Sequence, residues 1–195
     1  MSKLYFRFGA MNASKSVQLL TVAYNYEEQG KKVLCFTPST DDRYGHGKIT
    51  SRVGISREAL IVHSETDMFT IVEQNPVDCV LVDEAQFLTR EHIQQLANVA
   101  DDLNTPVMCY GLLKDFRNQF FEGSEALVLL ADSIEEIKTI CEHHNCGRKA
   151  TMILKIENGM PIYDGRQVEI GDAQYHSVCR FHYFHPQGIV TKQKH

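Results

Sequence analysis

Short apolar runs recur along the first two thirds of the chain, and segments with helical spacing separate them. Strands that are apolar throughout are buried on both faces, and right-handed crossover helices cover both faces of a parallel sheet. The pattern therefore predicts an α/β fold with helices on both sides of a parallel sheet. The expected strands are Leu4–Phe8, Val33–Thr37, Val77–Val82, Val107–Tyr110 and Leu127–Leu130.

Three segments between these runs are expected to be helices. The first covers about Lys15–Gln29 and the second about Glu65–Glu73. The third follows Thr89, a residue type favoured at helix N-caps. Its apolar residues share the i, i+3, i+4, i+7 spacing of one helix face: Ile93, Leu96, Ala97 and Ala100. In parallel sheets of this kind ligands bind at the carboxyl ends of the strands, so the residues that follow each strand are the functional candidates.

The segment after the first expected strand matches a phosphate-binding loop at all but one position. The pattern is G-x-x-x-x-G-K-[ST], and Ser14 stands in place of its second glycine. In such loops backbone N–H groups and the start of a helix face the phosphates, and the lysine bridges to the terminal ones. Alternatively, Gly9 closes a turn and Lys15 is a solvated lysine, but the strand before and the helix after favour the loop. The residues expected to bind ATP are Gly9, Ala10, Met11, Asn12, Ala13, Ser14, Lys15 and Ser16.

Ser14 makes this loop unusual. Glycine at this place permits a positive φ, a conformation that costs most other residues about 1 kcal/mol or more. A serine hydroxyl can donate to a phosphate oxygen and offset part of that strain, so we expect ATP to bind with a shifted geometry. The alternative is a nucleotide sensor without catalytic activity.

Two carboxylates, Asp83 and Glu84, follow the strand Val77–Val82. An aspartate at this edge can hold Mg²⁺ beside the loop hydroxyl, and the adjacent glutamate can meet an attacking hydroxyl group. Alternatively, both acids cap the next helix. The phosphate loop about 70 residues earlier favours the magnesium and base roles.

Two further loops are expected at the ligand edge. Residues 41–45 follow the second strand, and Arg52 and Arg57 come shortly after, so this segment either faces phosphates or is a charged surface loop. Residues 111–117 follow the strand that ends at Tyr110. They carry Phe116, whose ring either stacks on a base or fills the core.

The use of cysteine and histidine changes near residue 135. Cys35, Cys79 and Cys109 lie in apolar runs and are expected to be buried reduced thiols, whereas the other cysteines and most histidines lie further on. We therefore predict a nucleotide-binding domain over residues 1–134 and a small domain over residues 135–195. In the latter, Asn158-Gly159 between two apolar runs predicts a hairpin, with Pro161 on an edge strand.

Two pairs of metal-ligand residues flank this hairpin: Cys141-x₄-Cys146 and Cys179-x₂-His182. Paired spacing of this kind suits tetrahedral zinc with three sulfur ligands and one nitrogen ligand. His143 or His144 can substitute for one ligand, and an unligated thiol cluster is the remaining alternative. A closed site of four ligands leaves no position for catalysis, so its role is structural.

Charge and hydropathy exclude several classes. The longest apolar run, Ala126–Ala131, is far short of the roughly 20 residues of a membrane span. The N-terminus alternates like a strand and lacks the apolar core of a signal peptide, so we expect a cytoplasmic protein. A net charge of -5 disfavours nucleic acid as a partner.

Taken together, these motifs resemble the cellular-type thymidine kinases, phosphate-loop deoxynucleoside kinases with an appended zinc domain. The resemblance covers nearly the whole chain, in the right order. It rests on residues 9–16, 41–44, 82–87, 110–112, 115–117 and 175–180.

The resemblance implies ATP-dependent phosphorylation of the 5′-hydroxyl of thymidine, a step of nucleotide salvage. It makes Glu84 the catalytic base, has Lys15 and Ser16 hold the phosphates and Mg²⁺, and adds Arg43, Asp83 and Gln86 to the ATP site. A structural Zn²⁺, a homotetramer and feedback inhibition by thymidine triphosphate are implied as well. A lasso between the zinc pairs would read the pyrimidine edge. The residues implied to bind thymidine are Met11, Leu112, Phe116, Val168, Ile170, Gly171, Asp172 and Tyr175.

A zinc-ribbon ATPase that acts on nucleic acid is the main alternative function. It requires a basic face and further motor motifs, which a chain of 195 residues and charge -5 does not display.

Overall fold

The computed structural model describes residues 1–40, 47–168 and 173–187. Its main layer is a six-stranded sheet in the order β5-β2-β6-β7-β1-β8. Every pair of neighbouring strands in this sheet is parallel. The strands are β1 (Leu4–Gly9), β2 (Val33–Pro38), β5 (Leu60–Val62), β6 (Cys79–Val82), β7 (Val107–Gly111) and β8 (Ser133–Ile137).

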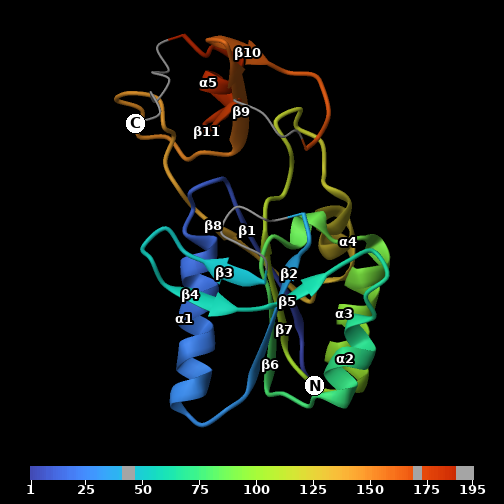
Figure 1. The fold of residues 1–195 in the computed structure, drawn as a ribbon. Helices are drawn as coiled ribbons and strands as arrows, with labels where there is room; N and C mark the ends of the chain where they lie inside the picture. The colour runs from blue at the N-terminus through green and yellow to red at the C-terminus, as the bar shows by residue number, and fades with distance from the viewer. Residues whose placement is uncertain (41–46, 169–172, 188–195) are drawn as a thin grey trace.

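Helices cover both faces of this sheet (Figure 1). One face packs against α1 (Lys15–Glu28) and a short antiparallel hairpin of β3 (Lys48–Thr50) and β4 (Ser56–Glu58). The other face packs against three helices and forms the larger core. They are α2 (Met68–Gln74), α3 (Arg90–Asp102) and α4 (Glu122–Leu130). The predicted α/β fold is confirmed.

The three expected helices are present, with small differences at their ends. α1 ends one residue before Gln29. α2 begins three residues later than expected, where the Asp67 side chain accepts a hydrogen bond from the Thr70 N–H. α3 begins after Thr89, whose hydroxyl accepts from the His92 N–H, as the N-cap pattern predicted. Among the described residues, no helix is long and apolar enough to cross a membrane.

The strand expected at Leu127–Leu130 is wrong, because these residues end α4. Leucine and alanine favour helices, and a short apolar run does not by itself distinguish a strand from a helix. Leu127 is fully buried whereas Leu129 is 67% exposed, as expected when one face of a helix packs on the sheet. The strand beside β1 is instead β8. At the opposite edge, β5 has only three residues, too few to show a periodic pattern.

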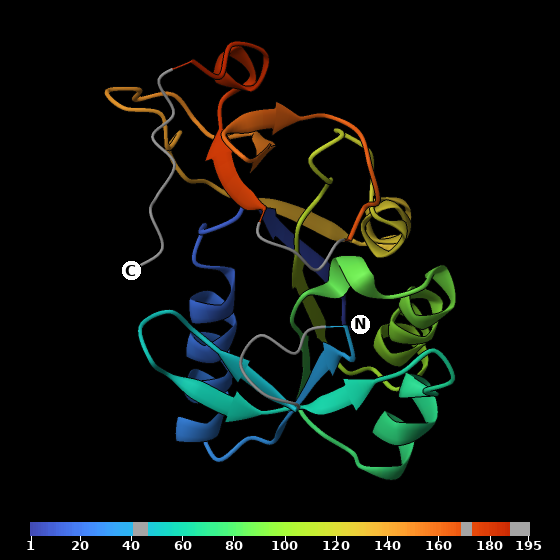
Figure 2. The same ribbon diagram turned by 45° about the horizontal axis from the view of Figure 1, so that its top comes forward.

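A small antiparallel sheet stands over the carboxyl ends of the central strands (Figures 1 and 2). Its order is β10-β9-β11, and α5 (Arg180–Phe184) packs against it. Asn158 and Gly159 form the turn between β9 and β10 with positive φ values of 50° and 76°. The predicted hairpin is confirmed, with Pro161 in the edge strand. The strands are β9 (Met152–Glu157), β10 (Met160–Ile162) and β11 (Gln174–Val178).

The division into two domains stays a prediction. The boundary expected near residue 135 falls inside β8, which pairs with β1 in the central sheet. The three cysteines expected in the core are buried, which confirms that prediction. Burial raises the pKa of Cys35 to about 11 and that of Cys79 to about 12, so both thiols stay protonated at neutral pH.

Candidate active site

The loop between β1 and α1 is the first part of the site. It starts at Gly9, where a Cβ atom would lie 2.7 Å from the Ile137 carbonyl oxygen, so only glycine fits beside β8. Lys15 begins α1, and its Nζ donates to the Ala10 carbonyl at 2.9 Å. The lysine therefore turns back along its own loop and is 8% exposed. The alternative of a solvated lysine is wrong.

Ser14 has the conformation that glycine adopts at this place in a phosphate loop. Its φ and ψ are 62° and 27°, in the left-handed region. As the residue before α1 it is the N-cap, but its side chain accepts no capping hydrogen bond. Asn12 also has a positive φ, of 65°. Asparagine tolerates this conformation better than most residues, so the backbone strain in this loop lies mainly at Ser14.

The phosphate loop meets the acidic end of β6. Ser16 Oγ donates to Asp83 Oδ2 at 2.8 Å. Asp83 is 4% exposed, and burial, with the charge of Glu84 as the second cause, raises the pKa of Asp83 to about 7. A hydroxyl and a carboxylate in contact give a pair of oxygen ligands of the type that Mg²⁺ takes. The two motifs, 67 residues apart, thus form one site.

Glu84, the residue after Asp83, has a positive φ of 49° and is followed by a short 3₁₀ turn, η1 (Ala85–Phe87). The Gln86 side chain donates to the Glu84 carboxylate and accepts from the Leu112 N–H at 3.0 Å. It therefore links the acid to the end of β7. Gly111 allows this arrangement, because a Cβ there would lie 2.5 Å from Gln86 Oε1. Neither acid caps α3, because Thr89 does so.

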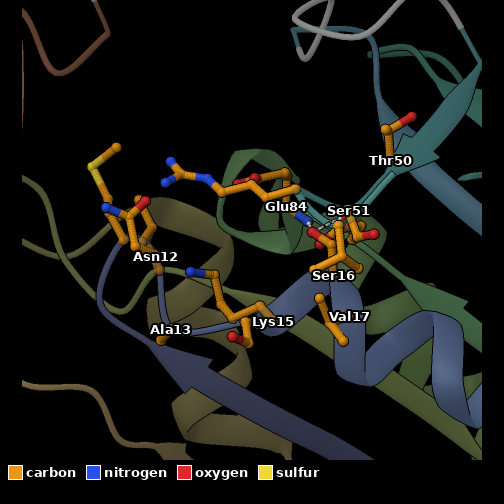
Figure 3. A pocket seen from close by; sticks show the side chains of 14 residues that line it. Asn12, Ala13, Lys15, Ser16, Val17, Thr50, Ser51 and Glu84 are labelled. Atoms are coloured by element: carbon orange, nitrogen blue, oxygen red, sulfur yellow. Dashed lines mark hydrogen bonds between the residues drawn. The ribbon is translucent and has the colours of Figure 1, made fainter. Parts of the chain in front are cut away.

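These elements surround one hollow of about 170 Å³ (Figure 3). The phosphate loop, both acids and part of the β3–β4 hairpin line it, and Figure 3 shows how their side chains surround the space. The lining residues are Met11, Asn12, Ala13, Ser14, Lys15, Ser16, Val17, Thr50, Ser51, Arg52, Val53, Asp83, Glu84 and Leu112.

Most of the residues that the β3–β4 hairpin contributes to the hollow were not predicted from the sequence. Arg52 was a candidate and lines the hollow, but Thr50, Ser51 and Val53 were not identified. Small polar residues without periodic spacing give no signal of their own. Arg57, the other arginine candidate, binds Glu27 of α1 at 2.6 Å and does not line the hollow.

Several expected ligand-binding residues lie elsewhere or outside the described residues. Arg43, Ile170, Gly171 and Asp172 belong to the segments that the structure does not describe. Val168 is 53% exposed and does not line the hollow.

Phe116 and Tyr175 form an aromatic pair in which Phe116 is buried and Tyr175 is half-buried. Their rings meet edge to face with centroids 6.3 Å apart. Phe116 is 2% exposed, and the Lys155 ammonium lies 4.9 Å from its ring centroid. Tyr183 donates to the Phe116 carbonyl at 2.6 Å. Phe116 therefore joins the loop after β7 to the small sheet.

Four metal-ligand residues converge in the small sheet region. The ligand atoms of Cys141, Cys146, Cys179 and His182 all lie within 4.8 Å of one another. Tetrahedral zinc with Zn–S bonds of about 2.3 Å keeps its sulfur ligands roughly 3.8 Å apart, so this cluster is compatible with a zinc ion. His182 Nδ1 lies 3.4 Å from Cys141 Sγ and 3.5 Å from Cys179 Sγ, which places the nitrogen ligand among the sulfurs.

The two alternative histidines do not belong to this cluster. His143 stacks on His182 with centroids 3.7 Å apart, but its ring nitrogens contact the carbonyls of His144 and Gln187. The sequence left several sets of zinc ligands open. Among the described residues, the set that comes together is the three cysteines with His182.

Comparison with known proteins gives consistent matches over nearly the whole chain. A family model described as thymidine kinase matches residues 2–183. The thymidine kinase of Lactobacillus johnsonii is 49% identical over 197 residues, which cover 95% of this chain and 98% of the relative. The thymidine kinase of Streptococcus pyogenes serotype M3 is 50% identical over 191 residues, which cover 96% of this chain and 100% of the relative. The thymidine kinase of Lactobacillus acidophilus is 50% identical over 200 residues, which cover 97% of this chain and 100% of the relative.

Proposed function

The chain belongs to the thymidine kinase family, and from this premise we propose that it transfers the terminal phosphoryl group of ATP to the 5′-hydroxyl of thymidine. The products are thymidine monophosphate and ADP. The observation that best supports this proposal is the hydrogen bond from Ser16 to Asp83, which joins the phosphate loop to the acidic strand end. Phosphoryl transfer depends on positioning and charge stabilisation, and such a site supplies both.

Lys15 and the loop backbone bind the ATP phosphates in this proposal. The first turn of α1 has N–H groups without helical partners, and the helix dipole favours negative charge in front of them. Lys15 Nζ, which donates to the Ala10 carbonyl, has phosphate oxygens as stronger partners once ATP is bound.

Ser16 and Asp83 are suited to hold Mg²⁺. This ion binds through one or two protein oxygens and completes its shell with phosphate oxygens and water. When bound, it neutralises charge on the phosphate oxygens. A cation beside the buried Asp83 favours its ionised form and so lowers the pKa from about 7.

Glu84 accepts the proton of the 5′-hydroxyl in this proposal. Gln86, which the family resemblance places in the ATP site, contacts Glu84 and the Leu112 N–H. It thereby limits the positions of the carboxylate. A general base must lie within hydrogen-bond reach of the proton it takes, so this restraint favours proton transfer.

Thymidine is proposed to bind on the side of Met11 and Leu112, which line the hollow together with Glu84. Phe116 and Tyr175, in mutual contact, are proposed to hold the base. The lasso residues implied by the family resemblance, Val168–Asp172, complete this part of the proposal.

Cys141, Cys146, Cys179 and His182 are proposed to hold a structural zinc ion. Three thiolates and one imidazole form a closed donor set of the kind found in structural zinc sites. The same four residues bracket β9, β10 and β11, so the ion would join the segment before β9 to the segment after β11 and stabilise the small sheet between them.

Three further properties are proposed from family membership: a homotetramer, feedback inhibition by thymidine triphosphate, and a cytoplasmic location. Gel filtration with light scattering tests the first. Inhibition kinetics with the triphosphate test the second, and cell fractionation tests the third.

The experiment that separates the candidate functions measures ATP consumption by the purified protein. Thymidine is expected to start consumption, and single-stranded DNA is expected to leave it unchanged. Consumption that depends on DNA and not on thymidine would favour the nucleic-acid ATPase. ATP binding without consumption under either condition would favour the nucleotide sensor.

A further inference from the structure

The tip of the phosphate loop has two non-glycine residues in the left-handed region, a conformation that serine disfavours and asparagine tolerates. Asn12 and Ser14 both have positive φ values, 65° and 62°. Ser14 makes no capping hydrogen bond through its side chain. A loop in this conformation keeps its shape only if contacts from its surroundings hold it.

Two such contacts come from residues that lie far away in the sequence. Asn12 Nδ2 donates to Glu142 Oε1 at 2.9 Å, and Ser177 Oγ donates to the Met11 carbonyl at 2.7 Å. Glu142 directly follows Cys141, and Ser177 belongs to β11. Two adjacent loop residues are therefore hydrogen-bonded to the small sheet region.

Glu142 is itself fixed in place. Its second carboxylate oxygen accepts from His176 Nδ1 at 3.1 Å, and its backbone N–H donates to the Ser177 carbonyl at 2.8 Å. His176 is 4% exposed, so this partner belongs to the packed interior of the small sheet. The carboxylate thus joins the loop to a rigid element on its other side.

We propose that Glu142 is a positioning residue that holds the phosphate loop in its nucleotide-binding shape through Asn12. The affinity for nucleotide then depends on a side chain of the small region, although that side chain lines no part of the hollow. This inference rests on the proposed function, since it assigns a role within the proposed ATP site.

The test is a double-mutant cycle on nucleotide binding. The dissociation constant of ADP with Mg²⁺ is measured by calorimetry, without thymidine, for the wild type, Asn12→Ala, Glu142→Ala and the double variant. Each single change is expected to weaken binding about 3- to 10-fold, the range for one hydrogen bond. The double variant is expected to bind about as weakly as the single ones, because both remove the same contact.

Rescue and kinetic readouts distinguish positioning from a general loss of structure. Glu142→Gln keeps an oxygen that accepts from Asn12, so it is expected to restore ADP affinity to within about twofold of the wild type. Glu142→Ala is expected to raise the KM for ATP while kcat at saturating ATP and the KM for thymidine stay within about twofold. Zinc content per chain is measured for each variant, because Glu142 adjoins Cys141.

Glu125→Ala is the matched control. This exposed glutamate of α4 pairs with Arg90 of α3 at 3.3 Å, on the sheet face opposite α1, so ADP affinity is expected not to change. Ser177→Ala removes the second contact and is expected to weaken ADP binding as well, which gives a separate test if Glu142→Ala does not fold.

Unchanged ADP affinity in both single variants, or losses that multiply in the double variant, would overturn the inference while leaving the proposed function standing. A wild type that binds no ADP would contradict both.

Discussion

Replacing Ser14 by glycine tests the strain in the phosphate loop. Ser14 has φ 62° and makes no capping hydrogen bond through its side chain, so glycine removes a backbone penalty and loses no capping contact. The left-handed conformation costs an L-residue about 1–2 kcal/mol, and glycine avoids this cost. The greater freedom of glycine in the unfolded chain reduces the resulting stabilisation by about 0.5–1 kcal/mol. Ser14→Gly is therefore expected to stabilise the protein by about 0.5–1 kcal/mol.

Thermal unfolding followed by calorimetry measures this change. A gain of that size corresponds to a rise in Tm of about 1–4 °C for a chain of this length. Ser14→Ala is the matched control, because it removes the hydroxyl but keeps the strained Cβ. Its Tm is expected to stay close to that of the wild type, since surface changes of this kind remain within about 0.5 kcal/mol.

The effect on nucleotide binding separates strain from function. The KM for ATP is expected to change less than about tenfold in Ser14→Gly, which corresponds to about 1.4 kcal/mol. A lower Tm in Ser14→Gly, or equal stabilisation by Ser14→Ala, would refute the strain argument. A wild type that binds no ATP while Ser14→Gly does would refute the proposal that the serine loop is functional.

Three further outcomes follow from the site. Glu84→Gln is expected to keep ATP and thymidine binding but to lower kcat by about 10²–10⁴-fold, as for loss of a general base; near-normal turnover would exclude this role. Gly111→Ala is expected to displace Gln86 and lower kcat, since the new Cβ would lie 2.5 Å from Gln86 Oε1 and 3.1 Å from its backbone nitrogen; unchanged kcat in a variant that still folds would show that Gln86 does not restrain Glu84. Metal analysis is expected to find about one zinc per chain. Removal of that zinc should raise the KM for thymidine before the central sheet unfolds. If thymidine affinity and the central sheet were lost at the same step of zinc removal, that result would contradict this structural role.

The parts of the site built from contiguous residues were predictable from the sequence. A strand, a glycine, a lysine with a hydroxyl and a helix occur in order over residues 4–28, and local chemistry determines that arrangement. The acidic pair after β6 was found in the same way. The sequence also identified position 14 as one where glycine permits a positive φ, and Ser14 has a φ of 62° there.

The parts that depend on distant contacts were not predictable. Asn12 and Glu142 are separated by 130 residues, and neither residue type marks the contact. Leu127–Leu130 was misassigned because the apolar pattern of so short a run does not distinguish a buried strand from a helix, and packing against the sheet decides between them. Thr50 and Ser51, at the end of β3 and in the turn after it, line the hollow, but their sequence context gives no sign of this.

The most direct test of the central claim follows the labelled terminal phosphate of ATP. The protein is incubated with thymidine, Mg²⁺ and ATP that carries the label in its terminal phosphoryl group, and the products are separated and identified. The label is expected in thymidine 5′-monophosphate, in an amount equal to the ADP formed, and Glu84→Gln is expected to lose nearly all of it. Label released only as inorganic phosphate, or at the same rate without thymidine, would contradict the account.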